Sequence, residues 1–257
     1  GLCADPDGTV FFSDCGGRLR RIDGRSGIVT TALGGTSIHD GGVAVRAFLC
    51  GPWGLSVGPD GHIYFADQWN QRVRAIDVAT GCIRTVAGNG ARAYGGDGGP
   101  AIEAYLGNPS DVSVGANGQV VIADGRHGHV RSVDEEGIIH NVAGAASQWD
   151  KGDGGPAICA NLIEPISVVH DADDAVYIGD RGAGRIRRID PETGVIDTVA
   201  GVGSPGYSGD GGSARKAEIG SPTSMAFDRE GNLYFSDELA HVIRRIDLCG
   251  TITTVVG

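Results

Sequence analysis

The sequence predicts an all-β fold made of repeated four-stranded sheets, and three recurring landmarks carry that prediction. Prolines recur at intervals of 57, 56 and 57 residues, and aspartates close two successive apolar runs in every repeat. The prolines are Pro52, Pro109, Pro165 and Pro222; the aspartates are Asp14, Asp67, Asp124, Asp180 and Asp237, followed by Asp23, Asp77, Asp134, Asp190 and Asp247. Landmarks that share one period identify tandem repeats. Five copies of a four-stranded unit with short links predict the antiparallel blades of a β-propeller, because one sheet alone cannot bury both of its faces.

The second repeat illustrates the four strands, here called a to d. Residues 55–57 alternate between apolar and polar and predict strand a, and residues 59–61 form a tight turn in which glycine supplies the positive φ. The apolar run 63–66 predicts strand b, the alternating run 73–76 predicts strand c, and 83–86 predicts strand d. Each run is rich in β-branched residues and too short for a helix to compete.

A glycine-rich connection follows strand d. Gly-Asp-Gly-Gly recurs at 96–99, 152–155 and 209–212, with a His-Asp-Gly-Gly counterpart at 39–42. Small apolar residues after Pro100 predict one short helical turn, which we expect Asp97 and its equivalents to cap by accepting backbone N–H bonds. Calcium is an alternative occupant of these loops, although each offers a single carboxylate. The acidic stretches 5–8 and 171–174 resemble ion-binding loops, but their place in the repeat predicts hairpin turns.

Length and composition agree with one globular domain. The chain has 257 residues, 45 of them glycine, and a formal charge of −11. We expect a single domain over 1–257, with blades at about 1–51, 52–108, 109–164, 165–221 and 222–257. The acidic balance makes nucleic acid a poor partner. No apolar run reaches the length of about 20 residues that a membrane helix needs, so we expect a soluble chain with no membrane insertion. The given chain has no signal peptide, and its compartment stays open because a leader could have been removed.

The six cysteines fall at unrelated repeat positions: Cys3, Cys15, Cys50, Cys82, Cys159 and Cys249. Their spacing includes no Cys-x-x-Cys pair and matches no metal-ligand pattern. We therefore expect isolated, mostly buried thiols. Cys15 and Cys50 are the pair to examine for a disulfide, because both should lie on one rim of the first blade.

The repeat resembles the NHL family of β-propellers. In the second copy the resemblance rests on Pro52, Gly54, Leu55, Gly61, Tyr64, Asp67, Asn70, Arg72, Val73, Arg74, Ile76 and Asp77, and in the fifth on 231–235 and 244–247. The Gly-Asp-Gly-Gly-Pro-Ala connection is similar to the long-linker form common in bacterial members. The resemblance implies a propeller that binds proteins or RNA, acts as a sensor or, rarely, catalyses. Such propellers usually have six blades, so the five visible copies either close by themselves or belong to a longer chain.

The irregular sequence concentrates on one rim, formed by the b–c loops and the d–a connections. Loops on a rigid scaffold are where function usually lies, and aromatic side chains are common anchors of recognition surfaces. The candidate rim consists of Trp53, Trp69, Asn70, Arg72, Tyr94, Asp111, Arg126, Trp149 and Tyr207. We therefore predict a binding or interaction scaffold that recognises a protein, peptide or glycan ligand.

The alternative is a propeller enzyme, similar to lyases and lactonases, with a divalent metal near the central axis. Its candidate residues are Arg126, His127, His129 and His241. The three histidines replace the Asn and Arg positions of the family, and imidazole nitrogens suit zinc. No cofactor is required by the sequence, and zinc and calcium are the metals considered. The paired arginines 20–21, 187–188 and 244–245 have a structural explanation, because they can pair with the repeat aspartates.

Overall fold

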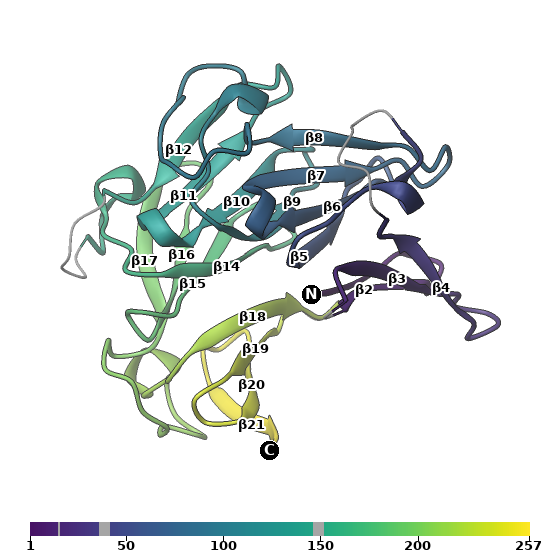
Figure 1. Ribbon diagram of the computed structural model, residues 1–257. Helices are drawn as coiled ribbons and strands as arrows, with labels where there is room; N and C mark the ends of the chain where they lie inside the picture. Colours follow the sequence, from purple (N-terminus) through teal and green to yellow (C-terminus); the bar gives the residue numbers. More distant parts are fainter. Residues whose placement is uncertain (15, 36–41, 146–151) are drawn as a thin grey trace. The chain divides into compact units, whose positions relative to one another are not determined.

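The computed structural model describes residues 1–14, 16–35, 42–145 and 152–257, which form five antiparallel sheets, four of them with four strands and one with a short fifth strand on its edge (Figure 1). Blade 1 holds β1 (Leu2–Ala4), β2 (Val10–Asp14), β3 (Arg18–Ile22) and β4 (Val29–Leu33). Blade 2 holds β5 (Pro52–Val57), β6 (Ile63–Asp67), β7 (Arg72–Ile76) and β8 (Ile83–Ala87). Blade 3 holds β9 (Pro109–Val114), β10 (Val120–Asp124), β11 (His129–Val133) and β12 (Ile139–Ala143).

Blades 4 and 5 repeat the pattern. Blade 4 holds β14 (Pro165–His170), β15 (Val176–Asp180), β16 (Arg185–Ile189) and β17 (Val195–Ala200), with the short β13 (Gly155–Pro156) on its edge. Blade 5 holds β18 (Pro222–Phe227), β19 (Leu233–Asp237), β20 (Val242–Ile246) and β21 (Ile252–Val256). In every blade the four main strands follow one another in sequence order. The predicted all-β propeller class with four-stranded antiparallel blades is confirmed.

Outside residues 15, 36–41 and 146–151, the helical content is limited to single turns of 3-10 helix. Four of them lie in the d–a connections: η1 (Ala44–Arg46), η3 (Ala101–Glu103), η5 (Ala157–Cys159) and η6 (Ala214–Lys216). Two lie in b–c loops: η2 (Gln68–Asn70) and η4 (Gly125–His127). The short turn predicted after the glycine-rich segment is therefore present. Within the residues that the structure describes, no helix has the length and apolarity needed to cross a bilayer.

Two compact units divide the chain, one made of 1–122 with 132–140 and the other of 123–131 with 141–257. In the first unit, Phe65 of blade 2 packs in one cluster with Phe11 of blade 1. The opposite face of blade 2 carries Val73, which packs in a second cluster with Ile122 of blade 3. In the second unit, Phe235 of blade 5 belongs to a cluster that includes residues of blade 4. Burial of apolar surface between neighbouring sheets is thus the main stabilising contribution within each unit.

Each d–a connection pairs with the outer strand of the blade that it enters. The bridges are Val43 with Cys82, Pro100 with Ile138, Gly155 with Ile196, and Ser213 with Thr251. The first backbone N–H of the 3-10 turn also donates a hydrogen bond to the blade that the connection enters. In η3, for example, the Ala101 N–H donates to the Gly137 carbonyl at 2.8 Å. These contacts cover outer strands that would otherwise expose unpaired backbone groups. They also link the connection to its own blade before the chain reaches strand a.

The Asp-Gly-Gly segments make no side-chain caps, and Asp153 and Asp210 pair with arginines instead. No side-chain cap bond is present at η3, η5 or η6, so the capping prediction is wrong. The N-cap position lies three residues after the aspartate, at Pro100, Pro156 or Ser213. Instead, Asp153 and Asp210 each lie 2.6 Å from a guanidinium nitrogen, of Arg187 and Arg244 respectively. The predicted pairing of strand-c arginines with repeat aspartates is confirmed.

The strand-b aspartates anchor the chain as it enters strand a. Asp67 accepts a bond from the Cys50 backbone N–H at 2.8 Å, and Asp237 accepts one from the Ser221 N–H at 2.9 Å. Asp180 accepts from the N–H of Glu164 at 2.8 Å. All three aspartates are fully buried. Burial raises the pKa of Asp67, although hydrogen bonds and the nearby Arg74 favour the ionised form.

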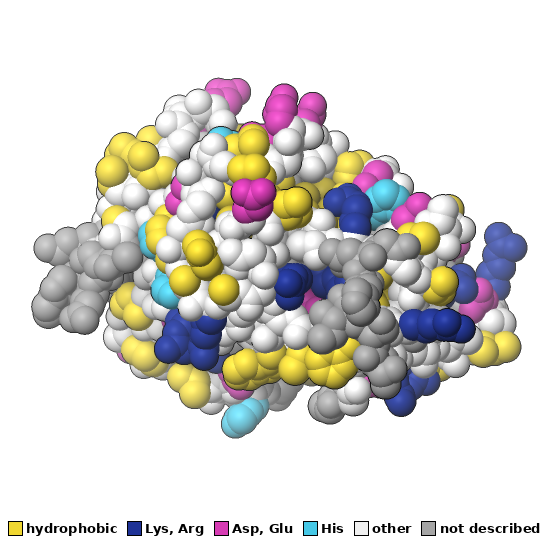
Figure 2. Space-filling view, turned by 45° about the horizontal axis from the view of Figure 1, so that its top comes forward, with side chains coloured by type: hydrophobic (Ala, Val, Ile, Leu, Met, Phe, Trp, Pro, Cys, Tyr) yellow, Lys and Arg dark blue, Asp and Glu magenta, His cyan; other side chains and the backbone are white. Residues whose placement is uncertain are grey.

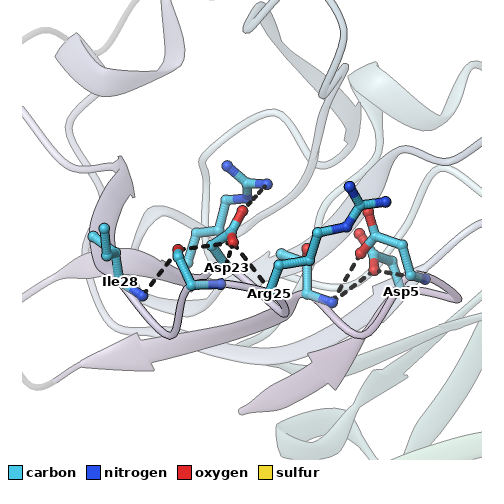
Figure 3. A network of polar contacts seen from close by, with 8 residues as sticks. Asp5, Asp23, Arg25 and Ile28 are labelled. Carbon is cyan, nitrogen blue, oxygen red and sulfur yellow. Dashed lines mark hydrogen bonds and ion pairs between the residues drawn. The ribbon is translucent and has the colours of Figure 1, made fainter.

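The acidic stretches near residues 5 and 171 are hairpin turns, as predicted. Asp5 Oδ1 accepts bonds from the backbone N–H groups of Asp7 and Thr9, at 3.2 and 3.0 Å (Figure 3). Asp171 Oδ1 accepts in the same way from Asp173 and Ala175, at 3.0 and 2.9 Å. In both stretches the first aspartate therefore stabilises its own turn by accepting two backbone N–H groups.

The cysteines described by the structure are free thiols. Cys3 and Cys50 are partly buried, and burial raises the pKa of the Cys3 thiol to about 12. Cys82, Cys159 and Cys249 are exposed, so the expectation of mostly buried thiols is wrong for these three. They lie in c–d hairpins or in the 3-10 turn of a connection, where side chains face solvent. Cys15, the other half of the pair considered for a disulfide, lies outside the described residues, and Cys50 is free.

Candidate functional site

Two tryptophans of blade 2 are the most exposed aromatic residues of the candidate rim in the first unit. Trp53, near the start of β5, is 50% exposed, and Trp69, in η2, is 56% exposed. The Trp69 ring lies over Gly51, where a Cβ atom would stand 2.1 Å from Trp69 Cδ1. The backbone N–H of Trp69 donates to the Cys50 carbonyl at 2.9 Å, which fixes the loop beneath the ring. Both indoles thus present large apolar surfaces from an ordered backbone.

Asn70 and Arg72 hold this loop in place. Asn70 Nδ2 donates to Asp67 at 2.9 Å. Arg72 donates to the carbonyl of Asn70 at 3.2 Å and to the carbonyl of Asn89, in the following connection, at 2.9 Å. Arg185 makes the matching contact in blade 4, donating to the Val202 carbonyl at 3.2 Å. These side chains therefore shape the rim by joining a b–c loop to a d–a connection.

Tyr94 and Asp111 are also engaged within the first unit. The Tyr94 hydroxyl donates to Asp97 at 2.6 Å. Asp111 Oδ1 accepts from the Val112 N–H at 2.9 Å and lies where a Cβ on Gly54 would stand, 1.8 Å away. Gly54 is therefore required at this point for the close approach of strand a of the next blade.

The histidine candidates in blade 3 have different surroundings. His127 Nδ1 lies 3.9 Å from the buried carboxylate of Asp124, and its neighbour Arg126 is exposed. His129 is only 6% exposed and shares a 3.2 Å hydrogen bond with Asn141, whose amide donates to the Gly144 carbonyl at 2.9 Å. His129 thus stands at the strand-c position of Arg72 and makes the same kind of link to a connection.

The expected register of His241 is wrong. His241 has a left-handed φ of 57° at the end of the b–c loop of blade 5, and Gln71 has a φ of 51° at the end of the corresponding loop in blade 2. Counting from the strand-b aspartate, it occupies the Gln71 position and not that of Asn70 or Arg72. It is exposed. Over the described ranges of the chain, no group of three or more His, Cys, Asp and Glu residues could hold a metal ion.

The remaining rim aromatics are Tyr207 and Trp149. Tyr207 is half exposed, but its hydroxyl lies 2.9 Å from the Thr254 hydroxyl and its ring lies 5.1 Å from the buried guanidinium of Arg244. It therefore covers the Arg244–Asp210 pair as a cation–π partner. Trp149 lies outside the described residues.

A groove that the sequence did not predict lies at the opposite ends of the strands in the second unit. A cavity of about 340 Å³ lies between blades 4 and 5, with Arg215 among its lining residues. The repeat itself carried a signal, because the corresponding position is Ile102 in one connection and Ile158 in another.

Two protein families match segments of this chain. The NHL repeat family matches residues 49–76, which include the Asp67, Asn70, Arg72 and Arg74 positions described above, and the teneurin NHL domain family matches residues 89–151. The chain belongs to the NHL-repeat β-propeller family. Asn70 and Arg72 of its signature are accordingly loop-fixing residues in this NHL protein.

Its relatives are much longer proteins. Protein SUPPRESSOR OF QUENCHING 1, chloroplastic, of Arabidopsis thaliana is 26% identical over 243 residues, which cover 90% of this chain and 23% of that protein. Teneurin-3 of Danio rerio is 30% identical over 220 residues, covering 74% of this chain and 8% of the relative. This NHL chain thus spans less than a quarter of the length of these two relatives.

Solved structures with the same fold include both enzymes and a chain from a protein complex. Virginiamycin B lyase from Staphylococcus aureus aligns with a TM-score of 0.61 at 18% identity, covering 100% of this chain and 69% of the lyase. A gluconolactonase from Xanthomonas campestris gives 0.63 at 15%, covering 96% and 71%. A chain of a nidogen/laminin complex gives 0.66 at 17%, covering 97% and 75%. At these identities the similarity concerns the fold of this NHL protein.

Proposed function

We propose that this NHL protein is a binding scaffold that recognises a protein, peptide or glycan through its rim of b–c loops and d–a connections. The observation that carries the proposal is the pair of half-exposed indoles, Trp53 and Trp69, on an ordered backbone. A large aromatic side chain costs little to present singly and contributes strongly when a partner buries it. The neighbouring polar residues Asn70 and Arg72 keep the loop in one conformation, which reduces the entropy lost on binding.

The surface charge favours a protein or glycan over nucleic acid. The net charge is −11, and in the view of Figure 2 basic side chains are interspersed with acidic and hydrophobic ones. Binding to a phosphate backbone depends on clustered cations. The resemblance to teneurin NHL domains and to a chain of a nidogen/laminin complex supports an interaction role.

The test compares wild-type protein with Trp53→Ala and Trp69→Ala on a glycan array and against a displayed peptide library. We expect specific ligands whose binding falls at least about tenfold in either variant, as for interface anchors. Ile28→Ala, which removes a similarly exposed apolar side chain from a blade 1 hairpin, is the matched control and should bind normally. Ligands that bind both tryptophan variants as well as they bind wild type would contradict the proposal.

The second candidate function is a metal-dependent lyase or hydrolase, and the structurally similar proteins include a virginiamycin B lyase and a gluconolactonase. The observation that favours it is the exposed Arg126 beside His127, which lies 3.9 Å from the buried Asp124 carboxylate. A guanidinium and an imidazole on one loop could stabilise charge and transfer a proton. A stoichiometric divalent metal in the purified protein, lost in His127→Ala, would favour the enzyme over the scaffold.

A further inference from the structure

A groove in the second unit lies between blades 4 and 5 at their a–b and c–d turns, and one d–a connection reaches it from the rim discussed above. Its cavity of about 340 Å³ is at the lower end of the range for small-molecule sites, about 300–1,000 Å³. Three segments of blade 5 border it: the turn at Gly231, the hairpin 247–250, and the connection residues Ser213 and Arg215. Blade 4 contributes Tyr177 and Val199.

The floor of the groove is apolar and aromatic. Tyr177 and Phe227 meet edge to face, with ring centroids 5.0 Å apart and an interplanar angle of 76°. Leu233 and Ile246 are buried behind them in the cluster between the two blades. Leu248, at the mouth, is 77% exposed. A flat ring entering here would find aromatic edges and a buried aliphatic wall.

Arg215 supplies a positive charge at the mouth of this groove. It is exposed, and among the described residues it makes no hydrogen bond or ion pair, in contrast to the strand-c arginines. The other nearby guanidinium, Arg188, is already 3.2 Å from Asp190 and lies 5.9 Å from the centre of the Tyr177 ring. On the acidic side, Asp247 is occupied by N–H donors of its own turn, from Cys249 and Thr251, both at 2.9 Å.

The corresponding positions of an earlier repeat have the opposite chemistry. Between blades 2 and 3 the position of Arg215 is Ile102, and the positions of Leu248 and Cys249 are Glu135 and Glu136. The framework is shared, since Tyr177 corresponds to Tyr64 and Ile246 to Val133. The fifth repeat therefore has an arginine and two uncharged residues at the positions where the earlier repeat has an isoleucine and two glutamates.

We propose that the groove between blades 4 and 5 binds a small carboxylic acid whose apolar body is about the size of a phenyl ring. The ring lies on Tyr177 and Phe227, and the carboxylate pairs with Arg215, which can donate two parallel hydrogen bonds to it. A second adjoining cavity shares Arg215 and Val199 and is lined by Asp190, Glu192, Asp197 and Arg188, of which Arg188 is paired with Asp190. The carboxylates of Glu192 and Asp197 disfavour an anion on that side. The site is independent of the tryptophan rim.

The probe is 3-phenylpropionate, with 3-phenylpropan-1-ol and 3-phenylpropylamine as neutral and cationic controls of the same shape. Calorimetric titration should give saturable binding of the acid, with weaker binding of the alcohol and none of the amine. Arg215→Ile, which installs the residue of the earlier repeats, should weaken the acid about tenfold, the value of one charge-assisted interaction. Arg215 is exposed, so this variant folds, and equal melting temperatures confirm it. Trp69→Ala should leave the acid's affinity unchanged.

Cys249 lines the same groove and gives a second readout. It is an exposed free thiol, as are Cys82 and Cys159 elsewhere in the chain. Saturating 3-phenylpropionate should slow the alkylation of Cys249 by iodoacetamide without slowing that of Cys82 or Cys159, measured by peptide mass spectrometry. Equal affinity for acid and amine, unchanged binding in Arg215→Ile, or no protection of Cys249 would each overturn the proposal.

Discussion

At the scale of single residues, the repeat depends on arginines that are fully buried. Arg74, Arg187 and Arg244 have almost no exposed surface, and two of them pair at 2.6 Å with a carboxylate from the connection. Asp210 shows how far one such carboxylate reaches. It pairs with Arg244 and also accepts the backbone N–H of Thr254 at 3.0 Å, which ties the connection to β21. The same ion pair in blades 4 and 5 therefore gives the Asp-Gly-Gly aspartate a structural role.

Asp210→Ala should lower the free energy of unfolding by about 2 kcal/mol, because it leaves the buried Arg244 charge without its carboxylate. The value lies below that for a wholly buried pair, since the Asp210 side chain is itself 40% exposed. Urea denaturation measures the change. Asp173→Ala, in an exposed hairpin turn, is the control and should change stability by less than about 0.5 kcal/mol. Similar losses in both variants would contradict the role of the pair.

Trp69 and Phe65 lie four residues apart and should respond differently to truncation. Phe65 is fully buried between blades 1 and 2, whereas Trp69 is 56% exposed. Phe65→Ala should cost about 3–5 kcal/mol, as for other buried aromatics, and Trp69→Ala should barely move the melting temperature. Thermal melts decide between them. A large drop for Trp69→Ala would mean that this ring seals the blade edge and would weaken its role as a binding anchor.

At the scale of elements, the strands and turns followed from sequence, but their long-range partners did not. The strand runs, the a–b turns and the 3-10 turns depend on neighbouring residues, so local patterns predicted them. The Arg244–Asp210 pair joins residues 34 positions apart, and the pairing of Ser213 with Thr251 joins a connection to the repeat that follows it. Periodicity places such residues in register without showing which of them touch. His129 shows the same limit. A histidine at a position where other repeats have arginine suggested a metal ligand, but in the structure it shares a hydrogen bond with Asn141.

The hairpin turns carry aspartates whose ionised form is stabilised by the fold. Hydrogen bonds lower the pKa of Asp23, Asp77, Asp134, Asp190 and Asp228. For Asp23 the main donor is the Ser26 backbone N–H, and for Asp190 it is that of Thr193. A carboxylate whose pKa is lower in the folded chain adds stability above its unfolded pKa, near 4, and loses it as pH falls through the folded value.

Stability should therefore fall as pH decreases below about 4, with net proton uptake on unfolding. Asp67 and Asp5 oppose this trend, because burial raises the pKa of each and favours protonation in the folded chain, but the five turn aspartates outnumber them. Urea midpoints between pH 6 and pH 3 measure the slope. Asp23→Asn with Asp190→Asn should flatten it, since the amides keep the turn geometry but do not titrate. An unchanged slope in the double variant would show that these turns are not its source.

At the scale of the whole molecule, repetition distributes stability unevenly along the chain. Every residue of β6, β10 and β11 is buried. By contrast, β4 begins with three exposed residues, and β21 ends with two. In repeat architectures each unit is stabilised mainly by its immediate neighbours, so coverage of a sheet by adjacent residues sets its local stability. The five blades share one sequence pattern but not one degree of burial.

Hydrogen exchange should reproduce this difference. Backbone amides open through local fluctuations whose free energy rises with burial and local packing, so β6, β10 and β11 should exchange slowest in the 257-residue chain. The amides of β4 and β21 should exchange orders of magnitude faster, although they are hydrogen-bonded to β3 and β20. Exchange followed by mass spectrometry resolves these strands as separate peptides.

The Gly211 N–H, which donates to the Ile252 carbonyl in β21 at 2.8 Å, provides an internal marker for the connection. If the connection secures the outer strand, Asp210→Ala should speed exchange in β21 and leave β10 unchanged. Equal protection of β4, β10 and β21 would mean that the sheets open together, and stability would then be a property of the whole chain and not of neighbouring blades.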